Sequence, residues 1–454
     1  MSDLYFKYNV TPRVLLADKP QTVSVVGLDR SMPLYDDNEY IVTLIACDMW
    51  EYYEGKVLRE INCSKEFRLR PVNGVLSFQD DFHGEHEWKV KIEQVENTHV
   101  PETMLKYHPK NAANYKLSLE FSLYSLREDL YRLRPYKGDI HIHTTGSDGK
   151  ESPEITAAQY RKYGFDYIAV TDHHNMESSL EAIEYYKNID TALKLFPGEE
   201  VHPCGNLHMI SFNSRYSVCA LAREDADRNE REVLEIAKEF NDTDSETAYA
   251  LAWYKWVCDN IRKAGGVAIY PHPLWKPRGR VNIPLSTTLE ILKRGLCDVY
   301  EVYGGTDRNN NRMQVQLSHQ LASEGYKLPI VACSDSHDSL SHNYSRFDQA
   351  WTVTFAENAE EIPDAVKNGM SVAVDNFVPS DRNVYGDFRL VQYTWFLLEN
   401  YYETHDELCN AAGQAIIRYV HGDRSQNTVI SLLEKEIREF SEGFFGNDGF
   451  TVDQ

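Results

Sequence analysis

The segment DIHIHTTGSDG, residues 139–149, decides the expected fold and chemistry of this chain. Its two histidines, His141 and His143, are two residues apart in a predicted strand, so both side chains project from the same face. Two imidazoles on one face can reach a single metal ion, and Asp148 adds a carboxylate shortly afterwards. An isolated H-x-H is more often incidental, so the interpretation depends on the residues at the ends of the neighbouring strands.

Short apolar runs alternate with helical stretches around and after this segment, which predicts a parallel sheet wrapped by helices. The expected strands are residues 139–144, 167–172, 193–201, 207–212, 266–272, 298–304 and 329–335. Seven such strands are typical of a barrel. Only about five residues separate the third strand from the fourth, whereas a parallel crossover needs a dozen or more. We therefore expect these two strands to form an antiparallel hairpin.

Potential metal ligands stand at the ends of these strands, which read TDHH (171–174), PGEE (197–200), YPHP (270–273) and CSDSH (333–337). Barrel enzymes carry their active sites at the C-terminal ends of the strands. His208 lies near the start of its strand, and the hairpin brings it to the same rim beside Glu200. The sequence therefore predicts nine ligands: His141, His143, Asp148, His173, Glu200, His208, His272, Asp335 and His337.

Together these motifs resemble the polymerase and histidinol phosphatase (PHP) family of metal-dependent phosphoesterases. The resemblance covers roughly residues 136–375 and rests on H-x-H-T…S-D-G, T-D-H, G-E-E followed by a histidine, P-H-P and S-D-S-H. It implies a distorted (β/α)7 TIM-like barrel that binds two or three divalent ions of zinc, manganese or iron. By this resemblance one ion takes His141, His143, Glu200 and Asp335, the second takes Glu200, His208 and His272, and the third takes Asp148, His173 and His337. The predicted catalytic residues are Glu200, Asp335 and His272.

The resemblance also implies hydrolysis of a small phosphate ester or nucleotide by a hydroxide that bridges two ions, without a protein nucleophile. Three divalent ions and three carboxylates would leave a net charge of about +3, which favours an anionic phosphate. Five cations follow strand ends and are candidates for binding that phosphate, although solvated loop charge is the ordinary alternative for each: Lys276, Arg278, Arg280, Arg308 and Arg346.

Four alternatives remain beside this interpretation. A 5′–3′ exonuclease or phosphodiesterase for short oligonucleotides would differ in substrate length only. A carboxyl-ester or carbamate hydrolase also fits, because metal-bound hydroxide can cleave a neutral ester and such enzymes join a β-sandwich to a similar barrel. An amidohydrolase-like binuclear barrel usually needs a bridging lysine, which is absent from the end of the fourth strand, and it leaves Asp148 and His337 unexplained. The intact ligand positions disfavour a non-enzymatic binding protein.

The flanking regions have different patterns. Residues 1–133 show a period of two, which predicts an all-β sandwich domain with strands at 22–28, 40–47, 57–62, 75–78, 88–92 and 117–123. The barrel is expected over 134–386 and a mainly helical extension over 387–454. In that extension helical spacing predicts a core-facing row of Val429, Leu433, Ile437 and Phe440.

Composition limits the possible partners. The 454 residues include 70 acidic and 47 basic side chains, a net charge of −23, so the chain should repel long nucleic acids and take a small phosphorylated substrate or short nucleotide. Eight cysteines without C-x-x-C spacing predict reduced thiols and no structural zinc module. No apolar leader or membrane-length apolar run occurs, so we expect a cytoplasmic protein without a membrane partner.

Overall fold

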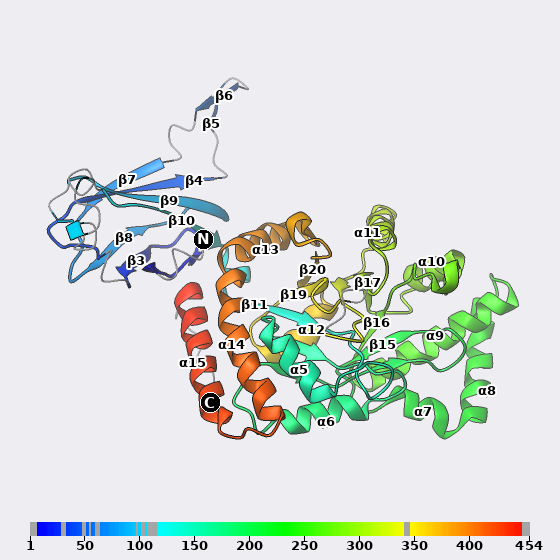
Figure 1. The fold of residues 1–454 in the computed structure, drawn as a ribbon. Coiled ribbons are helices and arrows are strands. Elements are labelled where there is room, and N and C mark those ends of the chain that lie inside the picture. Colours follow the sequence, from blue (N-terminus) through cyan, green and yellow to red (C-terminus); the bar gives the residue numbers. More distant parts are fainter. Residues whose placement is uncertain are drawn as a thin grey trace. The chain divides into compact units, whose positions relative to one another are not determined.

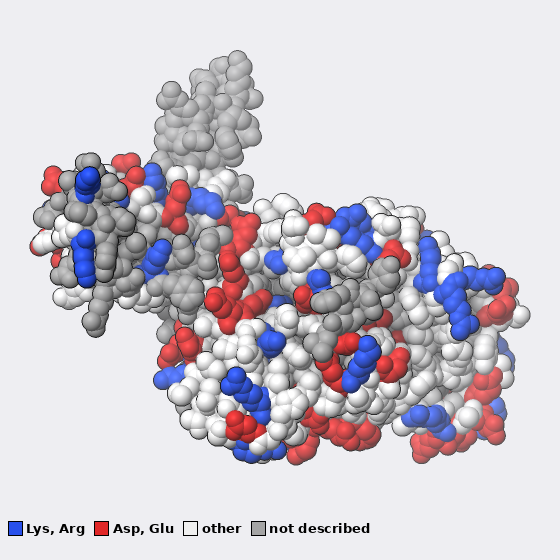
Figure 2. Space-filling model, in the orientation of Figure 1, with Lys and Arg blue, Asp and Glu red and all other residues white. Residues whose placement is uncertain are grey.

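A computed structural model describes residues 7–28, 33–47, 51–53, 56–59, 64–96, 99–100, 105–106, 110, 116–339 and 346–446 (Figure 1). The chain divides into two compact units. Unit 1 comprises Met1–Leu133, Trp395–His405 and Lys435–Gln454, and unit 2 comprises Arg134–Thr394 and Asp406–Glu434. Acidic and basic side chains are interspersed over the face shown in Figure 2. None of the helices in the described part of the chain is long and apolar enough to span a bilayer.

Unit 1 is built on mainly antiparallel strands in which buried and exposed side chains alternate. Its sheets have the orders β1-β3-β8, β2-β10-β9-β4-β7 and β5-β6. The strands are β1 (Tyr8–Thr11), β2 (Val14–Leu16), β3 (Gln21–Gly27), β4 (Tyr40–Ala46), β5 (Glu51–Tyr53), β6 (Lys56–Arg59), β7 (Ser64–Leu69), β8 (Val75–Asp80), β9 (His86–Gln94) and β10 (Ser118–Leu126), followed by the short helix α4 (Glu128–Tyr131). Val25 of β3 and Val90 of β9 are fully buried in one shared core.

Most of the strands predicted in this region correspond to β3, β4, β8, β9 and β10. The predicted strand at 57–62 corresponds in part to β6, and its residues 60–62 lie outside the described residues. Strands β1, β2, β5 and β7 were not predicted.

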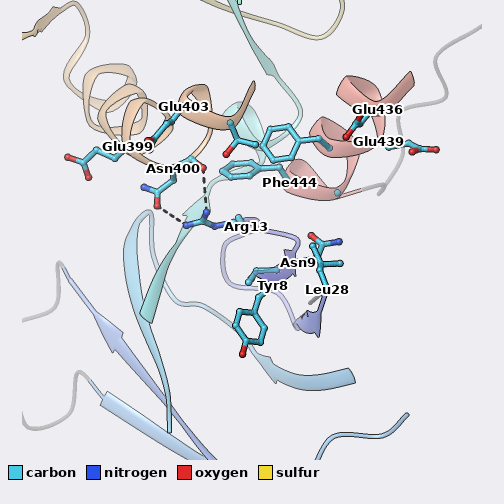
Figure 3. A pocket seen from close by; sticks show the side chains of 14 residues that line it. Tyr8, Asn9, Arg13, Leu28, Glu399, Asn400, Glu403, Glu436, Glu439 and Phe444 are labelled. Carbon is cyan, nitrogen blue, oxygen red and sulfur yellow. Dashed lines mark hydrogen bonds between the residues drawn. The ribbon is translucent and has the colours of Figure 1, made fainter. Parts of the chain in front are cut away.

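Two further segments of unit 1 come from the helices α13 (Phe388–Asn400), α14 (Tyr402–Val420) and α15 (Gln426–Phe445), each of which also extends into unit 2. The buried guanidinium of Arg13 donates hydrogen bonds to the Ser122 carbonyl (2.8 Å) and to Asn400 Oδ1 (2.7 Å). Burial lowers the pKa of Arg13 to about 10. Arg13 and Asn400 line a cavity of about 390 Å³ together with Phe444 and four glutamates (Figure 3).

Unit 2 contains the predicted ligand segments and has a mixed α/β fold with two larger sheets. Their orders are β13-β12-β11-β19-β20-β21 and β14-β15-β16-β17-β18. The strands are β11 (Arg134–Asp139), β12 (Tyr167–Ala169), β13 (Lys194–Phe196), β14 (Gly198–Val201), β15 (Met209–Phe212), β16 (Val267–Tyr270), β17 (Val299–Tyr303), β18 (Ile330–Ala332), β19 (Ala350–Ala356), β20 (Ser371–Asp375) and β21 (Asn383–Tyr385). Strands β12 and β14 to β17 are buried throughout, as expected for a sheet covered on both faces.

The predicted hairpin is confirmed: β14 pairs antiparallel with β15, with Glu200 opposite Ile210. Two predicted strands differ from the structure. Strand β11 ends at Asp139, so His141 and His143 lie on a tail beyond the regular strand. The predicted strand 193–201 divides at Pro197 into β13 and β14, which belong to different sheets. Strands β19, β20 and β21 were not predicted.

The two larger sheets meet at their strand ends. Isolated parallel bridges join Ile142 to Ser336 and His173 to Glu200. The amide of Thr171 donates to the Ile142 carbonyl at 2.8 Å, which joins the tails that follow β11 and β12. These contacts bring the predicted ligand segments next to one another.

The helices of unit 2 connect and cover these strands. They are α5 (Pro153–Lys162), α6 (Glu177–Tyr186), α7 (Val218–Glu224), α8 (Ala226–Ala237), α9 (Ser245–Lys263), α10 (Leu285–Lys293), α11 (Arg308–Ser323) and α12 (Ile362–Lys367). Helices α7, α8 and α9 form an insertion between β15 and β16 (Figure 1). In α15 the predicted core position Val429 is 42% exposed, whereas Ile430 and Ile437 are buried.

Candidate metal centre

Asp139 fixes the tail that carries the first two histidines. Its buried carboxylate accepts hydrogen bonds from the His141 amide (3.1 Å), the Ser334 amide (3.2 Å) and the Tyr160 hydroxyl (2.9 Å). Burial raises the pKa of Asp139 to about 7. Because Ser334 follows β18, this carboxylate ties the tail of β11 to the tail that carries Asp335.

A first group of donor atoms comes from His141, His143, Glu200 and Asp335. Asp335 Oδ1 lies 3.2 Å from His141 Nε2 and 3.1 Å from His143 Nε2. Glu200 Oε2 lies 3.7 Å and 3.5 Å from the same two nitrogens. Two ligand atoms that each lie about 2.1 Å from one ion are roughly 3.4 Å apart in a tetrahedral site. The separations in this group match that spacing.

Several of these donor atoms are buried and lack a hydrogen-bond partner. Among the described residues this is true of His141 Nε2, both ring nitrogens of His143 and Glu200 Oε2. Buried polar atoms are normally paired, and leaving them unpaired costs free energy. A divalent cation would satisfy them, and the imidazole and carboxylate donors suit zinc, manganese or iron. The residues therefore fit a divalent metal ion.

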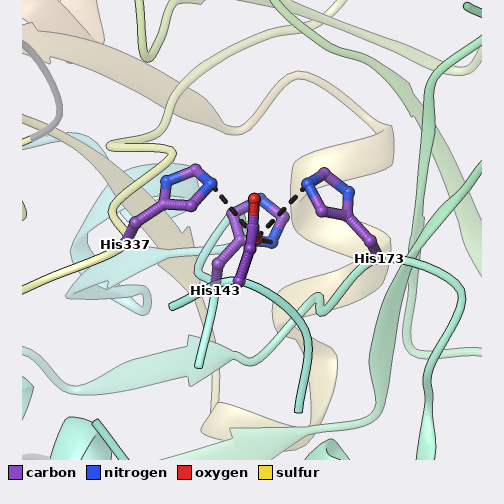
Figure 4. Close-up of side chains that lie close together, drawn as sticks. His143, His173 and His337 are labelled. Atoms are coloured by element: carbon purple, nitrogen blue, oxygen red, sulfur yellow. Dashed lines mark ion pairs between the residues drawn. The ribbon is translucent and has the colours of Figure 1, made fainter. Parts of the chain in front are cut away.

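Two further groups adjoin the first. Glu200 Oε1 lies 2.7 Å from His208 Nδ1 and 3.4 Å from His272 Nε2. Asp148 Oδ1 lies 3.5 Å from His173 Nε2, 3.4 Å from His337 Nε2 and 3.9 Å from His143 Nδ1. Figure 4 shows how His143, His173 and His337 converge. The structure thus brings together all nine residues that the sequence singled out.

Burial and charge act in opposite directions on the pKa values of this cluster. Burial raises the pKa of Glu200, but the attraction of His141, His173, His202 and His208 to its carboxylate outweighs burial and holds that pKa well below its usual value. Asp335 is affected in the same way, chiefly by the charge of His141. Burial lowers the pKa of His208 to about 4 despite the neighbouring Glu200. Glu200 and Asp335 are therefore ionised and His208 is neutral at pH 7, which are the forms that bind metal.

Two other residues support the donor atoms. Glu301, in the middle of β17, is fully buried and accepts hydrogen bonds from His141 Nδ1 and from the His272 amide, both at 2.9 Å. Gly305 lies against Asp335, since a Cβ atom there would come within 2.3 Å of the Asp335 side chain. A carboxylate on the far nitrogen of a ligating histidine fixes the ring and raises its basicity.

Two aromatic residues near the centre were not predicted as part of it. His202 Nε2 lies 3.3 Å from Glu200 Oε2, and its ring stacks on His208 with 3.8 Å between centroids. The ring of Trp275 lies 5.3 Å from that of His272. The E-V-H spacing of Glu200 and His202, two residues apart in extended chain, is a signal that could have identified His202.

The five cations proposed for phosphate differ in their surroundings. Lys276, Arg278 and Arg280 are exposed in the loop after β16 and form no ion pair with any described residue. Arg308 is paired with Asp381 at 2.6 Å, and Arg346 contacts Asp348. Within the described chain, none of the five hydrogen-bonds to the nine-residue cluster.

The family model of the PHP domain matches residues 139–243. This chain therefore contains a PHP domain, as the resemblance of its motifs predicted. The matched segment includes six of the nine clustered residues, from His141 to His208.

The similarity to individual proteins is weaker. A curated relative, the DNA polymerase/3′-5′ exonuclease PolX of Bacillus subtilis (strain 168), is 43% identical over 54 residues, which are 12% of this chain and 10% of the relative. A two-domain protein from Bacteroides vulgatus ATCC 8482, containing a predicted PHP-like metal-dependent phosphoesterase, is 17% identical with a TM-score of 0.37, over 54% of this chain and 66% of that one. A predicted metal-dependent phosphoesterase from Bifidobacterium adolescentis ATCC 15703 is 21% identical with a TM-score of 0.33, over 45% and 89% of the two chains. This chain thus spans a tenth of the length of its curated relative.

Proposed function

We propose that this chain is a PHP-type metal-dependent phosphoesterase, a hydrolase that acts on a small phosphate ester or nucleotide. The observation that carries the proposal is the convergence of nine imidazole and carboxylate side chains with unpaired, buried donor atoms. Two or three ions of zinc, manganese or iron would be held by the three groups described above. Bound there, such ions polarise a phosphoryl oxygen and lower the pKa of water.

The protein's own residues have distinct parts in this proposal. Glu200 faces His208 with Oε1 and His143 with Oε2, so it bridges two groups of donors. Asp335 draws together the two histidines after β11, and His272 completes the group around Glu200 Oε1. Nearby hydroxyls are already engaged, since Ser334 and Ser336 both hydrogen-bond to Tyr160. Water activated by the bound ions would be the nucleophile, so this proposal requires no protein nucleophile.

A closed barrel is part of the proposal. Bridges at Ile142–Ser336 and His173–Glu200 join the two larger sheets, so β11, β12 and β14 to β18 would form a ring of seven strands. The same proposal divides the chain into a β-sandwich over 1–133, the barrel over 134–386 and a helical extension over 387–454. The division of strands among the N-terminal sheets supports the sandwich.

Phosphate binding is assigned by this proposal to the loop after β16. Lys276, Arg278 and Arg280 have no ion-pair partner among the described residues, and the first of them follows His272 by only four residues. Arg308 and Arg346 would first have to exchange their carboxylate partners for phosphate. The segment matched to the exonuclease PolX favours cleavage of short oligonucleotides as a second candidate.

A substrate screen tests the proposal. The chain is loaded separately with zinc, manganese or iron and offered phosphomonoesters, dinucleotides, short oligonucleotides and carboxyl esters. We expect turnover of phosphate esters by wild type, and lower metal content and at least 100-fold lower turnover for His208→Ala. Unchanged activity of that variant would contradict the assigned site, and exclusive cleavage of uncharged esters would contradict the substrate class.

A further inference from the structure

His202 lies against the metal centre but is outside the nine residues that the PHP motifs identify. It follows Glu200 by two residues, at the end of β14, and its side chain is 13% exposed. Its Nε2 atom lies 3.1 Å from His173 Nδ1 in hydrogen-bond geometry. Its ring stacks on His208, with an interplanar angle of 28°. His202 therefore touches one residue from each of the two outer donor groups.

The hydrogen on His173 Nδ1 has two nearby acceptors, and geometry selects between them. Glu200 Oε2 is closer, at 2.6 Å, yet this oxygen has no hydrogen-bond partner, so it lies off the N–H direction of the ring. The N–H direction leads to His202 Nε2. Glu200 Oε2 thus stays open toward His141 and His143.

The opposite nitrogen of His173 determines the direction of this hydrogen bond. His173 Nε2 faces Asp148 Oδ1 at 3.5 Å, and Asp148 also faces His337. A neutral imidazole that binds a cation through Nε2 must carry its hydrogen on Nδ1. His202 Nε2 must then accept that hydrogen, and His202 carries its own hydrogen on Nδ1.

We propose that His202 is a positioning residue that holds His173 in the tautomer able to bind a metal ion together with Asp148 and His337. This inference rests on the proposed metal centre and deepens it. The second nitrogen of a ligating histidine usually donates its hydrogen to a carboxylate or carbonyl, and here a second histidine accepts it. Stacking on His208 fixes the plane of the His202 ring, which directs Nε2 toward His173.

The test measures bound metal in the full-length chain. Wild type, His202→Ala and His202→Gln are dialysed against the same free Co²⁺ concentrations, and bound ions are counted by elemental analysis and by visible absorption. We expect wild type to bind three ions. His202→Ala should lose one of them through a 10- to 100-fold weaker affinity, which is the usual effect of losing such a partner. His202→Gln should retain the third ion, because its amide oxygen can accept the same hydrogen.

Two controls make the result decisive. His174→Asn changes the adjacent exposed histidine and suits its positive φ of 57°, so it should bind three ions. Thermal unfolding of each metal-free variant checks folding. Full retention of the third ion by His202→Ala, or its loss from His202→Gln as well, would overturn the inference while leaving the proposed hydrolase intact. Wild type that binds fewer than three ions would overturn the inference, and wild type that neither binds metal nor cleaves a substrate would overturn the proposed function too.

Discussion

Glu301 is a carboxylate outside the donor groups that connects two histidine-bearing segments. It accepts hydrogen bonds from the His141 ring and from the His272 backbone, and both partners are buried. Glu301→Gln keeps an acceptor but removes the charge that raises the basicity of His141. We expect the affinity for zinc to fall 10- to 100-fold, as measured by competition with a chromophoric chelator. The control is Glu290→Gln, at a half-buried glutamate of α10 that pairs with Arg294, and equal affinities of the two variants would contradict this role.

Gly305 is required for a steric reason. A methyl group at this position would lie 2.3 Å from Asp335 Cβ and Oδ2, so Gly305→Ala must displace Asp335 from the two histidines after β11. We expect at least 100-fold lower turnover of a phosphate ester and reduced metal content. Gly325→Ala meets open space and adds only the strain of a φ of 94°, so its activity should be near wild type. Near-normal turnover of Gly305→Ala would show that Asp335 does not need its observed position.

At the residue scale, the sequence predicted the residues that carry the donor atoms but not the residues that hydrogen-bond to them. The nine clustered residues stand in short local motifs at strand ends, and a two-residue spacing is enough to place His141 and His143 on one face. Glu301 supports His141 from 160 positions away, and only the folded order of the strands creates that contact. His202 was missed for the same reason, because its partner His173 lies on another strand tail.

Among the helices of unit 2, a buried ion pair joins α5 to α15. Arg161 and Glu434 are both fully buried, and the guanidinium binds both carboxylate oxygens, at 3.0 Å and 2.6 Å. Glu434→Gln would leave the buried guanidinium with only the more distant carboxylate of Asp166, at 3.4 Å. We expect the free energy of unfolding to fall by about 3–5 kcal/mol, measured by urea denaturation. The double variant Arg161→Met/Glu434→Met should lose less free energy of unfolding, because it buries no unpaired charge. An equal or larger loss would show that the uncompensated guanidinium does not cause the destabilisation of Glu434→Gln.

The same pair predicts a pH dependence. Burial raises the pKa of Glu434, but the charge and hydrogen bonds of Arg161 outweigh it, so the net pKa lies below the usual value. A carboxylate of this kind stabilises the fold above its unfolded pKa of about 4.3, and the stabilisation is lost as the pH falls through the folded pKa. The stability difference between wild type and Glu434→Gln should therefore be constant from pH 6 to 8 and shrink below about pH 4.5. If the stability difference between the two proteins grows as the pH falls, the pKa of Glu434 is not lowered in the folded state.

At the scale of elements, the sequence predicted strands well where connections were informative. The few residues between Val201 and Leu207 allow only a hairpin, and β14 and β15 form one. The break at Pro197 was missed because the apolar run continues across it, whereas the chain passes from one sheet to the other there. Strands β19 to β21 follow the last ligand motif and pair antiparallel, so a search for parallel strands that end in ligands did not include them.

At the scale of the whole molecule, the most distant association in unit 1 could not be predicted. Residues 395–405 and 435–446 belong with the first 133 residues, and contacts such as Arg13 with Asn400 join positions 387 apart. Helical periodicity identifies a buried face but not the segment that covers it. The hydrophobic pattern alone therefore could not divide the C-terminal helices between the two units.

If the substrate is a phosphate ester, the negative net charge of the chain opposes its approach, and positive side chains near the site must offset this repulsion. The chain carries −23 overall, so an anion approaching the metal centre is repelled until it meets local positive charge. Lys276, Arg278 and Arg280 can supply that charge, because they are exposed and no described carboxylate pairs with them. Replacing all three by glutamine should lower kcat/KM for an anionic ester by about tenfold at low salt.

This loss should depend on both ionic strength and substrate charge. At 0.5 M salt the Debye length falls below about 8 Å, so the deficit of the triple variant should shrink. An uncharged carboxyl ester, if cleaved, should show no deficit at any salt concentration. The control variant, Lys187→Gln/Lys238→Gln/Lys367→Gln, changes the net charge equally on other elements and should stay near wild type. Equal losses in the two triple variants would mean that overall charge, rather than the loop after β16, governs the approach of the substrate.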